Sequence, residues 1–354
     1  MSGVESGKSG LIALSIALPW AQNGGIHPII DRAAHLRANQ TELEALWAQA
    51  KILHFCAGRF AAQGEEGEKE NGKRLLRFLD AQTVASLEAS GAFFHGERYF
   101  LGVSGNTPYF LWCTEPTDPT LFESSTKGSH EGVQGAYTSA YKNFATLRDL
   151  GDHLSALELE LTFHGQALAN WHHVHPFCAT CGARTSPAMG GSIRRCSADG
   201  KEHYPRTDPA VIVLVKDTDD RILLGHQKVW PEHRYSCFAG FVDPGEPFER
   251  AVLREVEEES GVEVADITYL GSQPWPFPAS IMIAYEALAL NPHTAKPDGA
   301  EIESVRWFSR KEMKKAVDDG TLLLPPTMSV ARAMINSWYG ERAAVDLSGP
   351  TAHR

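Results

Sequence analysis

The feature that most constrains this chain is an acidic segment bounded by glycines, GFVDPGEPFERAVLREVEEESGV, at residues 240–262. If its second half is a helix, Glu255, Glu258 and Glu259 lie three and four residues apart on one face. Like charges at that spacing repel one another and destabilise a bare helix. A hard divalent cation, which prefers oxygen ligands, would offset that repulsion. The segment therefore predicts a helix over 247–260 with a metal-binding acidic face.

The elements predicted around this helix form a mixed sheet covered by helices. Residues 209–228 place alternating apolar side chains before the turn sequence DTDD and predict a hairpin. Residues 280–290 and 305–308 predict two further strands, and residues 311–320 and 330–343 predict two closing helices. This order of strands, acidic helix, strands and terminal helix is typical of an α+β domain whose mixed sheet lies between helices.

The first part of the chain, residues 1–170, predicts a separate α+β domain with no catalytic motif of its own. Residues 91–105 and 107–115 predict strands. Apolar residues recur at helical spacing from Ser155 to about Trp171. Polar stretches between these elements predict two loops, at 62–73 and 115–135.

The composition is that of a soluble globular protein without a general affinity for nucleic acid. Hydrophobic residues make up 43% of the chain, charged residues 22%, and the formal net charge is −11. A small basic cluster could still touch an RNA, and it consists of Arg194, Arg195, Lys201 and Arg206. The apolar run near the start is interrupted by Pro19, so we expect no secretory signal, no membrane span and a cytoplasmic location.

A proline-rich segment, SQPWPFPAS at residues 272–280, follows the acidic stretch. Its prolines disfavour both a helix and a central strand, so the segment predicts a stiff loop. Such a loop would hold Trp275 and Phe277 in fixed poses, and rigid aromatic rings can stack on a purine or a nicotinamide ring. A packed loop without a ligand is the alternative for the segment taken alone.

The acidic stretch resembles the signature of the Nudix hydrolases, G-x5-E-x7-R-E-U-x-E-E-x-G-U with U aliphatic, at every defined position. An isolated EVEEE run is more often a solvated helix face, but the complete pattern argues against that alternative. The resemblance implies the Nudix fold, an α/β/α sandwich, and hydrolysis of a nucleoside diphosphate linked to another moiety. It further implies that Glu255, Glu258 and Glu259 bind Mg²⁺ or Mn²⁺, with the carbonyl of Ala239 as another ligand. Glu258 would also orient or deprotonate the attacking water.

The segment SQPWPFPAS, placed downstream of that signature, resembles the tag of the NADH pyrophosphatase branch. That branch cleaves NAD(H) to AMP and nicotinamide mononucleotide, and members remove NAD caps from RNA. Glu301 matches an additional metal-binding glutamate of the branch, although Glu303 stands two residues away. The residues implied to contact the substrate are Tyr204, Phe241, Ala331 and the tag residues Gln273, Pro274, Trp275, Pro276, Phe277, Pro278, Ala279 and Ser280.

The resemblance also implies the domain organisation. In the branch, the first domain is a divergent relative of the Nudix fold that packs in a homodimer. We therefore expect an N-terminal α+β domain over 1–170, a zinc-ribbon-like segment over 171–205 and a catalytic Nudix domain over 206–345.

The middle segment carries cysteines at metal-ligand spacing. Cys178 and Cys181 form a CxxC pair, and Cys196 follows. Bacterial members of the branch have a four-cysteine zinc ribbon here, whereas this sequence has Asp199 at the fourth position and His203 four residues further on. Tetrahedral Zn²⁺ accepts Cys, His and, less often, Asp. The resemblance implies a structural zinc completed by Asp199 or His203, and decay to a metal-free loop is the alternative.

Two other functions stay open on the sequence. The first is hydrolysis of ADP-ribose, FAD or another dinucleotide, against which the SQPWPFPAS segment argues. The second is a non-catalytic Nudix or zinc-ribbon binding protein, against which the complete acidic set and the negative net charge argue. The sequence does not distinguish free NADH or NAD⁺ from NAD-capped RNA as the substrate.

Overall fold

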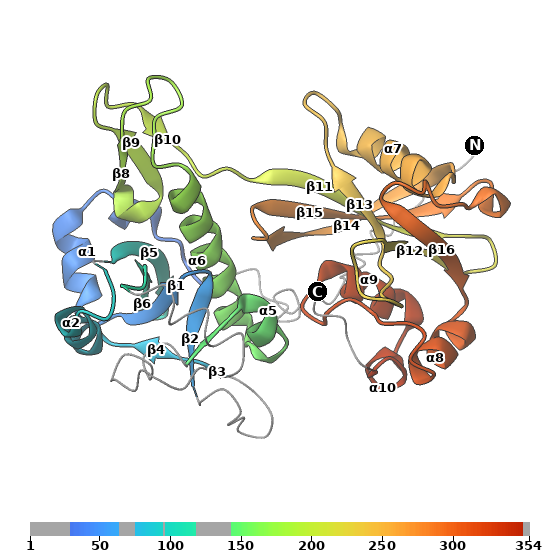
Figure 1. Ribbon diagram of the computed structural model, residues 1–354, viewed down its shortest axis with the longest axis horizontal. Coiled ribbons are helices and arrows are strands. Elements are labelled where there is room, and N and C mark those ends of the chain that lie inside the picture. Colours follow the sequence, from blue (N-terminus) through green and yellow to red (C-terminus); the bar gives the residue numbers. More distant parts are fainter. Residues whose placement is uncertain (1–28, 64–74, 95, 118–142, 350–354) are drawn as a thin grey trace, which may run out of the picture.

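The computed structural model describes residues 29–63, 75–94, 96–117 and 143–349 (Figure 1). The apolar run before Pro19 and most of the two loops expected at 62–73 and 115–135 lie outside the described residues. Within those described ranges, no helix is long and apolar enough to cross a membrane.

The N-terminal part is built on a seven-stranded sheet with the order β3-β2-β1-β6-β5, in which β4 pairs with β1 and β7 pairs with β2. Its strands are β1 (Lys51–Cys56), β2 (Arg59–Gln63), β3 (Leu75–Leu76), β4 (Phe78–Leu79), β5 (Glu97–Ser104), β6 (Thr107–Thr114) and β7 (Phe144–Ala145). Side chains of β1 alternate between two apolar cores, with Leu53 and Phe55 in one and Ile52 and Cys56 in the other. The sheet is therefore covered on both faces.

Among the described residues, the α-helices that accompany this sheet are α1 (Gln40–Trp47), α2 (Ala81–Ser90), α5 (Leu147–Leu150) and α6 (Ala156–Val174). The helix predicted from Ser155 to Trp171 is confirmed as α6, and a capping box explains where it begins. The Ser155 hydroxyl accepts from the backbone N–H of Glu158, while the Glu158 carboxylate accepts from the N–H of Ser155. Figure 1 shows α6 on the side of the N-terminal sheet that faces the rest of the chain.

A small three-stranded sheet with the order β10-β9-β8 follows α6. Its strands are β8 (Thr185–Ala188), β9 (Ile193–Cys196) and β10 (Glu202–His203). Within the described residues, none of the four clusters of buried apolar side chains includes a residue of this sheet. The segment thus holds its shape without an apolar core of its own.

The C-terminal part has a six-stranded mixed sheet with the order β14-β15-β11-β12-β16, and β13 pairs with β11. Strand β11 is parallel to β15, and the other pairs are antiparallel. The strands are β11 (Asp208–Lys216), β12 (Ile222–Gln227), β13 (Phe238–Phe241), β14 (Val264–Trp275), β15 (Ser280–Ala289) and β16 (Ile302–Phe308). The hairpin and the strands predicted from the sequence are all present.

Helices cover both faces of this second sheet. They are α7 (Phe248–Ser260), α8 (Arg310–Asp318), α9 (Val330–Tyr339) and α10 (Ala343–Asp346). Val213 of β11 packs on the α7 side with Val252 and Val256, whereas Ile212 and Leu214 pack on the α9 side. Because successive residues of a strand point to opposite faces, β11 contributes to both cores. The predicted α+β class with a sheet between helices is confirmed.

The proline-rich segment differs in part from its prediction. Residues 272–275 belong to β14, where they pair with β15, and only residues 276–279 form a turn. The strand is compatible with proline because β14 lies at the edge of the sheet, where Pro274 needs no N–H on its outer side. The expectation of a loop throughout was wrong, and the expectation against a central strand was confirmed.

Candidate functional site

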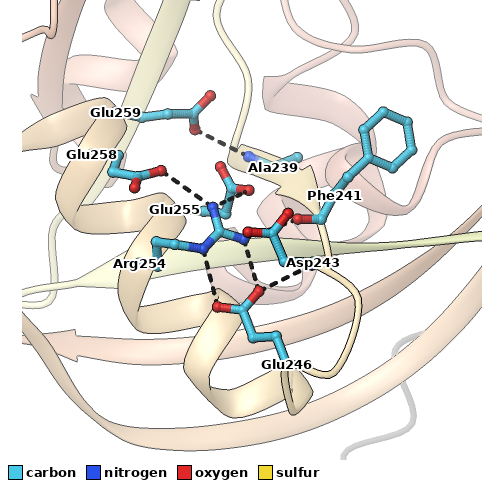
Figure 2. Close-up of polar contacts among 8 residues, drawn as sticks. All are labelled: Ala239, Phe241, Asp243, Glu246, Arg254, Glu255, Glu258 and Glu259. Carbon is cyan, nitrogen blue, oxygen red and sulfur yellow. Dashed lines mark hydrogen bonds and ion pairs between the residues drawn. The ribbon is translucent and has the colours of Figure 1, made fainter.

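Arg254 organises the acidic face of α7. Its guanidinium donates to Glu246 at 2.8 and 3.0 Å, to Glu255 at 2.7 Å and to Glu258 at 3.2 Å (Figure 2). It also donates to the carbonyl of Phe241 at 3.0 Å, which ties the loop before the helix to the helix itself. The hydrogen bonds to Glu246 and the other carboxylates raise the pKa of Arg254 above its ordinary value. Arg254 thus orients three carboxylates. Its single positive charge does not neutralise all three, so the cluster keeps a net negative charge.

Glu259 is the buried member of the acidic face. It is only 5% exposed, and its carboxylate accepts from the backbone N–H of Ala239 at 3.2 Å. Burial raises the pKa of Glu259 to about 8, and the charges of Glu301 and Glu255 add to the rise. Burial also raises the pKa of Glu255, with further contributions from Glu258 and Glu301 against the opposing effect of Arg254. Such crowded, partly desolvated carboxylates fit a hard divalent cation, which would supply the missing positive charge.

The structure distinguishes between Glu301 and Glu303 as the additional metal-binding glutamate. The charge of Glu301 acts on Glu259, and the Glu301 carboxylate accepts from the side chain of Gln227 at 2.8 Å. Glu303 instead lies 3.7 Å from His226. The geometry therefore favours Glu301 as the member of the acidic cluster.

Two glycines permit this arrangement. A Cβ on Gly240 would lie 1.9–2.2 Å from the carboxylate atoms of Glu255. A side chain at position 240 would therefore displace this carboxylate from its position on the acidic face. Gly261 ends α7 with a φ of 66°, the left-handed conformation typical of a helix C-terminus.

A pocket of about 180 Å³ opens beside Glu259, on the side of the proline-rich segment. Gln273 and Trp275 of β14 line it, and Ala331 of α9 lines it from another side. Gln273 is fully buried, and its side chain donates to the carbonyl of Met328 and accepts from the N–H of Val330. These bonds tie β14 to the start of α9. The pocket also contains Ala239, so predicted metal and substrate residues share one wall.

Other predicted substrate residues lie outside this pocket. Phe241 is 58% exposed, and its ring points away from the carboxylates (Figure 2). Tyr204 is exposed and donates to Glu202. Phe277 packs against Trp275 at 4.9 Å between ring centroids and lies beside the N-terminal core. Of the remaining tag residues, Pro276 and Ser280 are buried, Ala279 is partly buried, and Pro274 and Pro278 are exposed.

The N-terminal part holds the turn of the proline-rich segment. Gln166 of α6 donates to the carbonyl of Pro276 at 2.9 Å. Asn170 donates to the carbonyls of Pro276 and Pro278 at 3.1 and 2.9 Å. Arg148 of α5 lies over the ring of Phe277, 4.2 Å from its centroid. No sequence motif indicates these contacts, because they join residues more than a hundred positions apart.

The sequence analysis also missed polar and aromatic residues of the pocket. Gln227, Trp230 and Arg234 all line it, and none belongs to a recognisable motif. Arg234 stacks over the ring of Trp230, 4.6 Å from its centroid. An arginine and a tryptophan four residues apart, directly after a strand, are the only local signal that could have drawn attention to this wall.

The cysteine segment brings its predicted ligands together. One ligand atom from each of Cys178, Cys181, Cys196 and Asp199 lies within 4.8 Å of the other three. The sulfurs of Cys181 and Cys196 are 3.6 Å apart. Two sulfurs bound tetrahedrally to zinc at about 2.3 Å would lie about 3.8 Å apart, so the residues fit this ion. The backbone N–H of Cys181, helped by the side chains of Cys181 and His203, lowers the pKa of the Cys178 thiol to about 6.

The basic cluster proposed to touch RNA is only partly exposed. Arg194 is only 6% exposed and donates to Thr185 and His172 inside the protein. The other three cations pair with neighbouring carboxylates, namely Arg195 with Glu202, Lys201 with Asp199 and Arg206 with Asp208. Arg194 is therefore not accessible to an RNA, whereas Arg195, Lys201 and Arg206 stay at the surface and their contact with RNA stays a prediction.

Comparisons with known proteins agree with the arrangement of the two sites. The profile of the family described as NUDIX domain matches residues 206–324. The profile described as NADH pyrophosphatase zinc ribbon domain matches residues 173–204. These ranges contain the acidic helix and the cysteine cluster, respectively.

Curated relatives share these regions. The NAD-capped RNA hydrolase NudC of Mycobacterium bovis is 44% identical over 200 residues, which cover 54% of this chain and 64% of the relative. The NAD-capped RNA hydrolase NUDT12 of Homo sapiens is 40% identical over 197 residues, which cover 52% of this chain and 42% of the relative. This chain therefore spans less than two thirds of the length of either protein.

Among solved structures, a NUDIX hydrolase from Nitrosomonas europaea is 20% identical and covers 50% of this chain and 96% of that chain, with a TM-score of 0.38. The sequence profiles are more specific, because they match two adjoining segments whose described residues carry an acidic helix and a cysteine cluster. The chain therefore contains a Nudix domain, preceded by a zinc ribbon domain of the NADH pyrophosphatase type.

Proposed function

We propose that this protein is a metal-dependent pyrophosphatase that hydrolyses NAD(H) to AMP and nicotinamide mononucleotide, the latter in reduced form when the substrate is NADH. The observation that carries the proposal is the shared pocket. Glu259 of the acidic helix and Trp275 of the proline-rich segment line the same cavity, so the reactive end and the recognition end of a dinucleotide would be bound side by side. The relatives named as NAD-capped RNA hydrolases support the choice of an NAD-containing substrate.

The acidic face would perform the chemistry with Mg²⁺ or Mn²⁺. A divalent cation held by Glu255, Glu258, Glu259, Glu301 and the carbonyl of Ala239 would neutralise phosphate oxygens and lower the pKa of a water molecule. Glu258 has a 62% exposed side chain, so its carboxylate is accessible to solvent and can orient that water and accept its proton. The water oxygen bonds to phosphorus, the bridging P–O bond breaks, and the departing phosphate takes the electron pair.

The pocket would hold the nicotinamide half. Trp275 offers a ring face for stacking, and the hydrogen bonds of Gln273 to the start of α9 fix the distance between Trp275 and Ala331. The tag residues outside the pocket would act by positioning Trp275, since the carbonyls of Pro276 and Pro278 anchor the turn to α6.

Trp275→Ala is expected to lower kcat/KM for NADH. The corresponding rise in activation free energy is about 1–3 kcal/mol, the value of one lost stacking contact. Metal dependence should not change, because the indole of Trp275 has no oxygen atom that could bind a hard divalent cation. Steady-state kinetics on NADH at several Mn²⁺ concentrations measures both quantities. The matched control is Tyr269→Ala, which removes another aromatic ring of β14 that is 58% exposed and lies outside the pocket. Parental kinetics combined with early melting in Trp275→Ala would show that the segment is structural.

The remaining features follow from the same resemblance. We propose a structural zinc on Cys178, Cys181, Cys196 and Asp199, a homodimeric assembly and the three units 1–170, 171–205 and 206–345. We also propose a cytoplasmic location, because six cysteines in 354 residues, three of them at zinc-ligand spacing, are not the composition of a disulfide scaffold. NAD-capped RNA would enter the same pocket by its nicotinamide end.

The direct test is the identity of the products. With Mg²⁺ or Mn²⁺, the protein should convert NADH to AMP and the reduced mononucleotide, both resolved by chromatography. ADP-ribose, FAD and NAD-capped RNA should be compared by kcat/KM under the same conditions. Absence of AMP with either metal, while ADP-ribose is cut fast, would overturn the substrate assignment and leave the reaction class standing. No turnover of any of these substrates would favour the binding-protein alternative.

A further inference from the structure

Arg234 is an uncompensated cation in the wall of the pocket. It is partly buried, and its Nε atom is buried with no hydrogen-bond partner among the residues that the structure describes. Among the described residues, no carboxylate charge acts on it, and its guanidinium lies over the ring of Trp230, 4.6 Å from the centroid. A desolvated guanidinium without a counter-ion is costly to keep, which points to a function.

A second cation reinforces the first. Arg148 lies 4.2 Å from the ring centroid of Phe277 and 5.8 Å from that of Trp275. Burial and, to a smaller extent, the charge of Arg148 together lower the pKa of Arg234 to about 10. Both side chains stay protonated at neutral pH. The indole that would stack on a substrate ring therefore already has a guanidinium over it and another guanidinium in the same pocket wall.

The acidic side of the pocket does not cancel this charge in the working enzyme. Glu259 is the carboxylate that lines the pocket, and in the proposed function a divalent cation compensates it. Arg234 has no such partner. The ring-binding end of the pocket is thus electropositive when the metal is bound.

We propose that Arg234 selects the redox state of the substrate by disfavouring the positively charged oxidised nicotinamide ring relative to the neutral reduced ring. This inference rests on the proposed function, because it assumes that the ring enters the pocket beside Trp275. Repulsion between the Arg234 guanidinium and the charged nicotinamide ring, separated by roughly several ångströms in a partly solvated site, would change the preference for NADH over NAD⁺ by about three- to tenfold. Arg234 acts here as a specificity residue and not as a catalytic one.

The test compares kcat/KM for NADH and NAD⁺ in the parent, Arg234→Met and Arg234→Lys. Methionine keeps much of the length without the charge, and lysine keeps the charge without the fork of donors. Arg234→Met should raise the ratio of kcat/KM for NAD⁺ to kcat/KM for NADH by about three- to tenfold, while Arg234→Lys should retain the parental ratio. The matched control is Arg306→Met, because Arg306 also stacks on an aromatic ring, Phe308, but lies outside the pocket.

A second measurement keeps the proposal falsifiable if Arg234→Met is unstable. Equilibrium binding of oxidised and reduced nicotinamide mononucleotide to the parent should favour the reduced form, and Arg234→Gln should reduce that preference. An equal loss for both substrates would overturn the proposal, because the guanidinium would then bind a group common to both, such as phosphate. If Arg234→Met and Arg234→Gln both keep the parental preference for the reduced form over the oxidised form, the proposal is overturned as well. Failure of the parent to cleave either form of NAD while it cleaves ADP-ribose would instead be a failure of the proposed function.

Discussion

Glu258→Gln is expected to lower kcat on NADH by about two to four orders of magnitude, the range typical of a lost general base. The side chain is 62% exposed, and it contacts the rest of the helix only through one hydrogen-bonded ion pair of 3.2 Å with Arg254. An exposed pair of this kind contributes about 0–1 kcal/mol to the free energy of unfolding. Removal of one carboxylate also relieves repulsion with Glu255 three residues away. Activity and stability should therefore separate.

The experiment pairs steady-state rates with a thermal melt for Glu258→Gln and for Glu257→Gln. Glu257 is the neighbouring exposed glutamate and occupies an undefined position of the Nudix signature, so the same substitution there should leave kcat close to the parental value. If Glu258→Gln turns over like the parent, the role given to this face of α7 is wrong. If both variants lose activity to the same extent, the effect is one of net charge and not of a particular carboxylate.

Zinc removal is expected to have the largest effect on stability. The ribbon segment has no share in the apolar cores of the described residues, and its ligand atoms lie within 4.8 Å of one another. Binding of a structural zinc in such a segment contributes directly to folding. Dialysis against a chelator, or Cys178→Ser, should lower the melting temperature by at least about 5 °C. Since the metals of the acidic helix are separate, kcat measured well below that temperature should stay close to parental.

Elemental analysis decides whether the ion is present. The parent should contain one zinc per chain, Cys178→Ser should lose it, and Cys113→Ser should retain it because Cys113 lies outside the ligand cluster. Asp199→Asn should weaken zinc retention more than His203→Gln, since Asp199 belongs to the cluster and His203 lies beside Cys178. Zinc-free parent protein that melts normally would show that the ribbon has decayed to a linker.

Local patterns predicted the elements that carry the chemistry. The helix of Glu255 was predictable because its residues define both the acidic face and the buried face, and Gly261 marks its end. The hairpin over 209–228 was predictable because β11 is apolar on both sides and a polar turn follows. In these cases the determining contacts lie within one segment or between neighbouring ones.

Long-range contacts account for what the sequence did not predict. Residues 272–275 became an edge strand because β15 offers a partner across the sheet, which outweighed the low strand propensity of proline. Arg194 became a buried hydrogen-bond donor because His172 and Thr185 meet it in three dimensions. Arg234 gained a position in the pocket only because β14 and α9 close the opposite side. None of these partners is visible from spacing alone.

The anchoring of the proline-rich turn has a consequence for how such proteins can be divided. Proline has no N–H, so the carbonyls of Pro276 and Pro278 find no donors in the turn and take them from Gln166 and Asn170 of α6. The N-terminal half thus supplies part of the scaffold for the ring-binding wall at Trp275. A catalytic half severed from it could keep its sheet and its acidic helix and still lose the preorganised pose of that wall. In this chain, the C-terminal part alone can form the catalytic sheet, whereas the substrate-selecting wall at Trp275 also requires α6 of the N-terminal part.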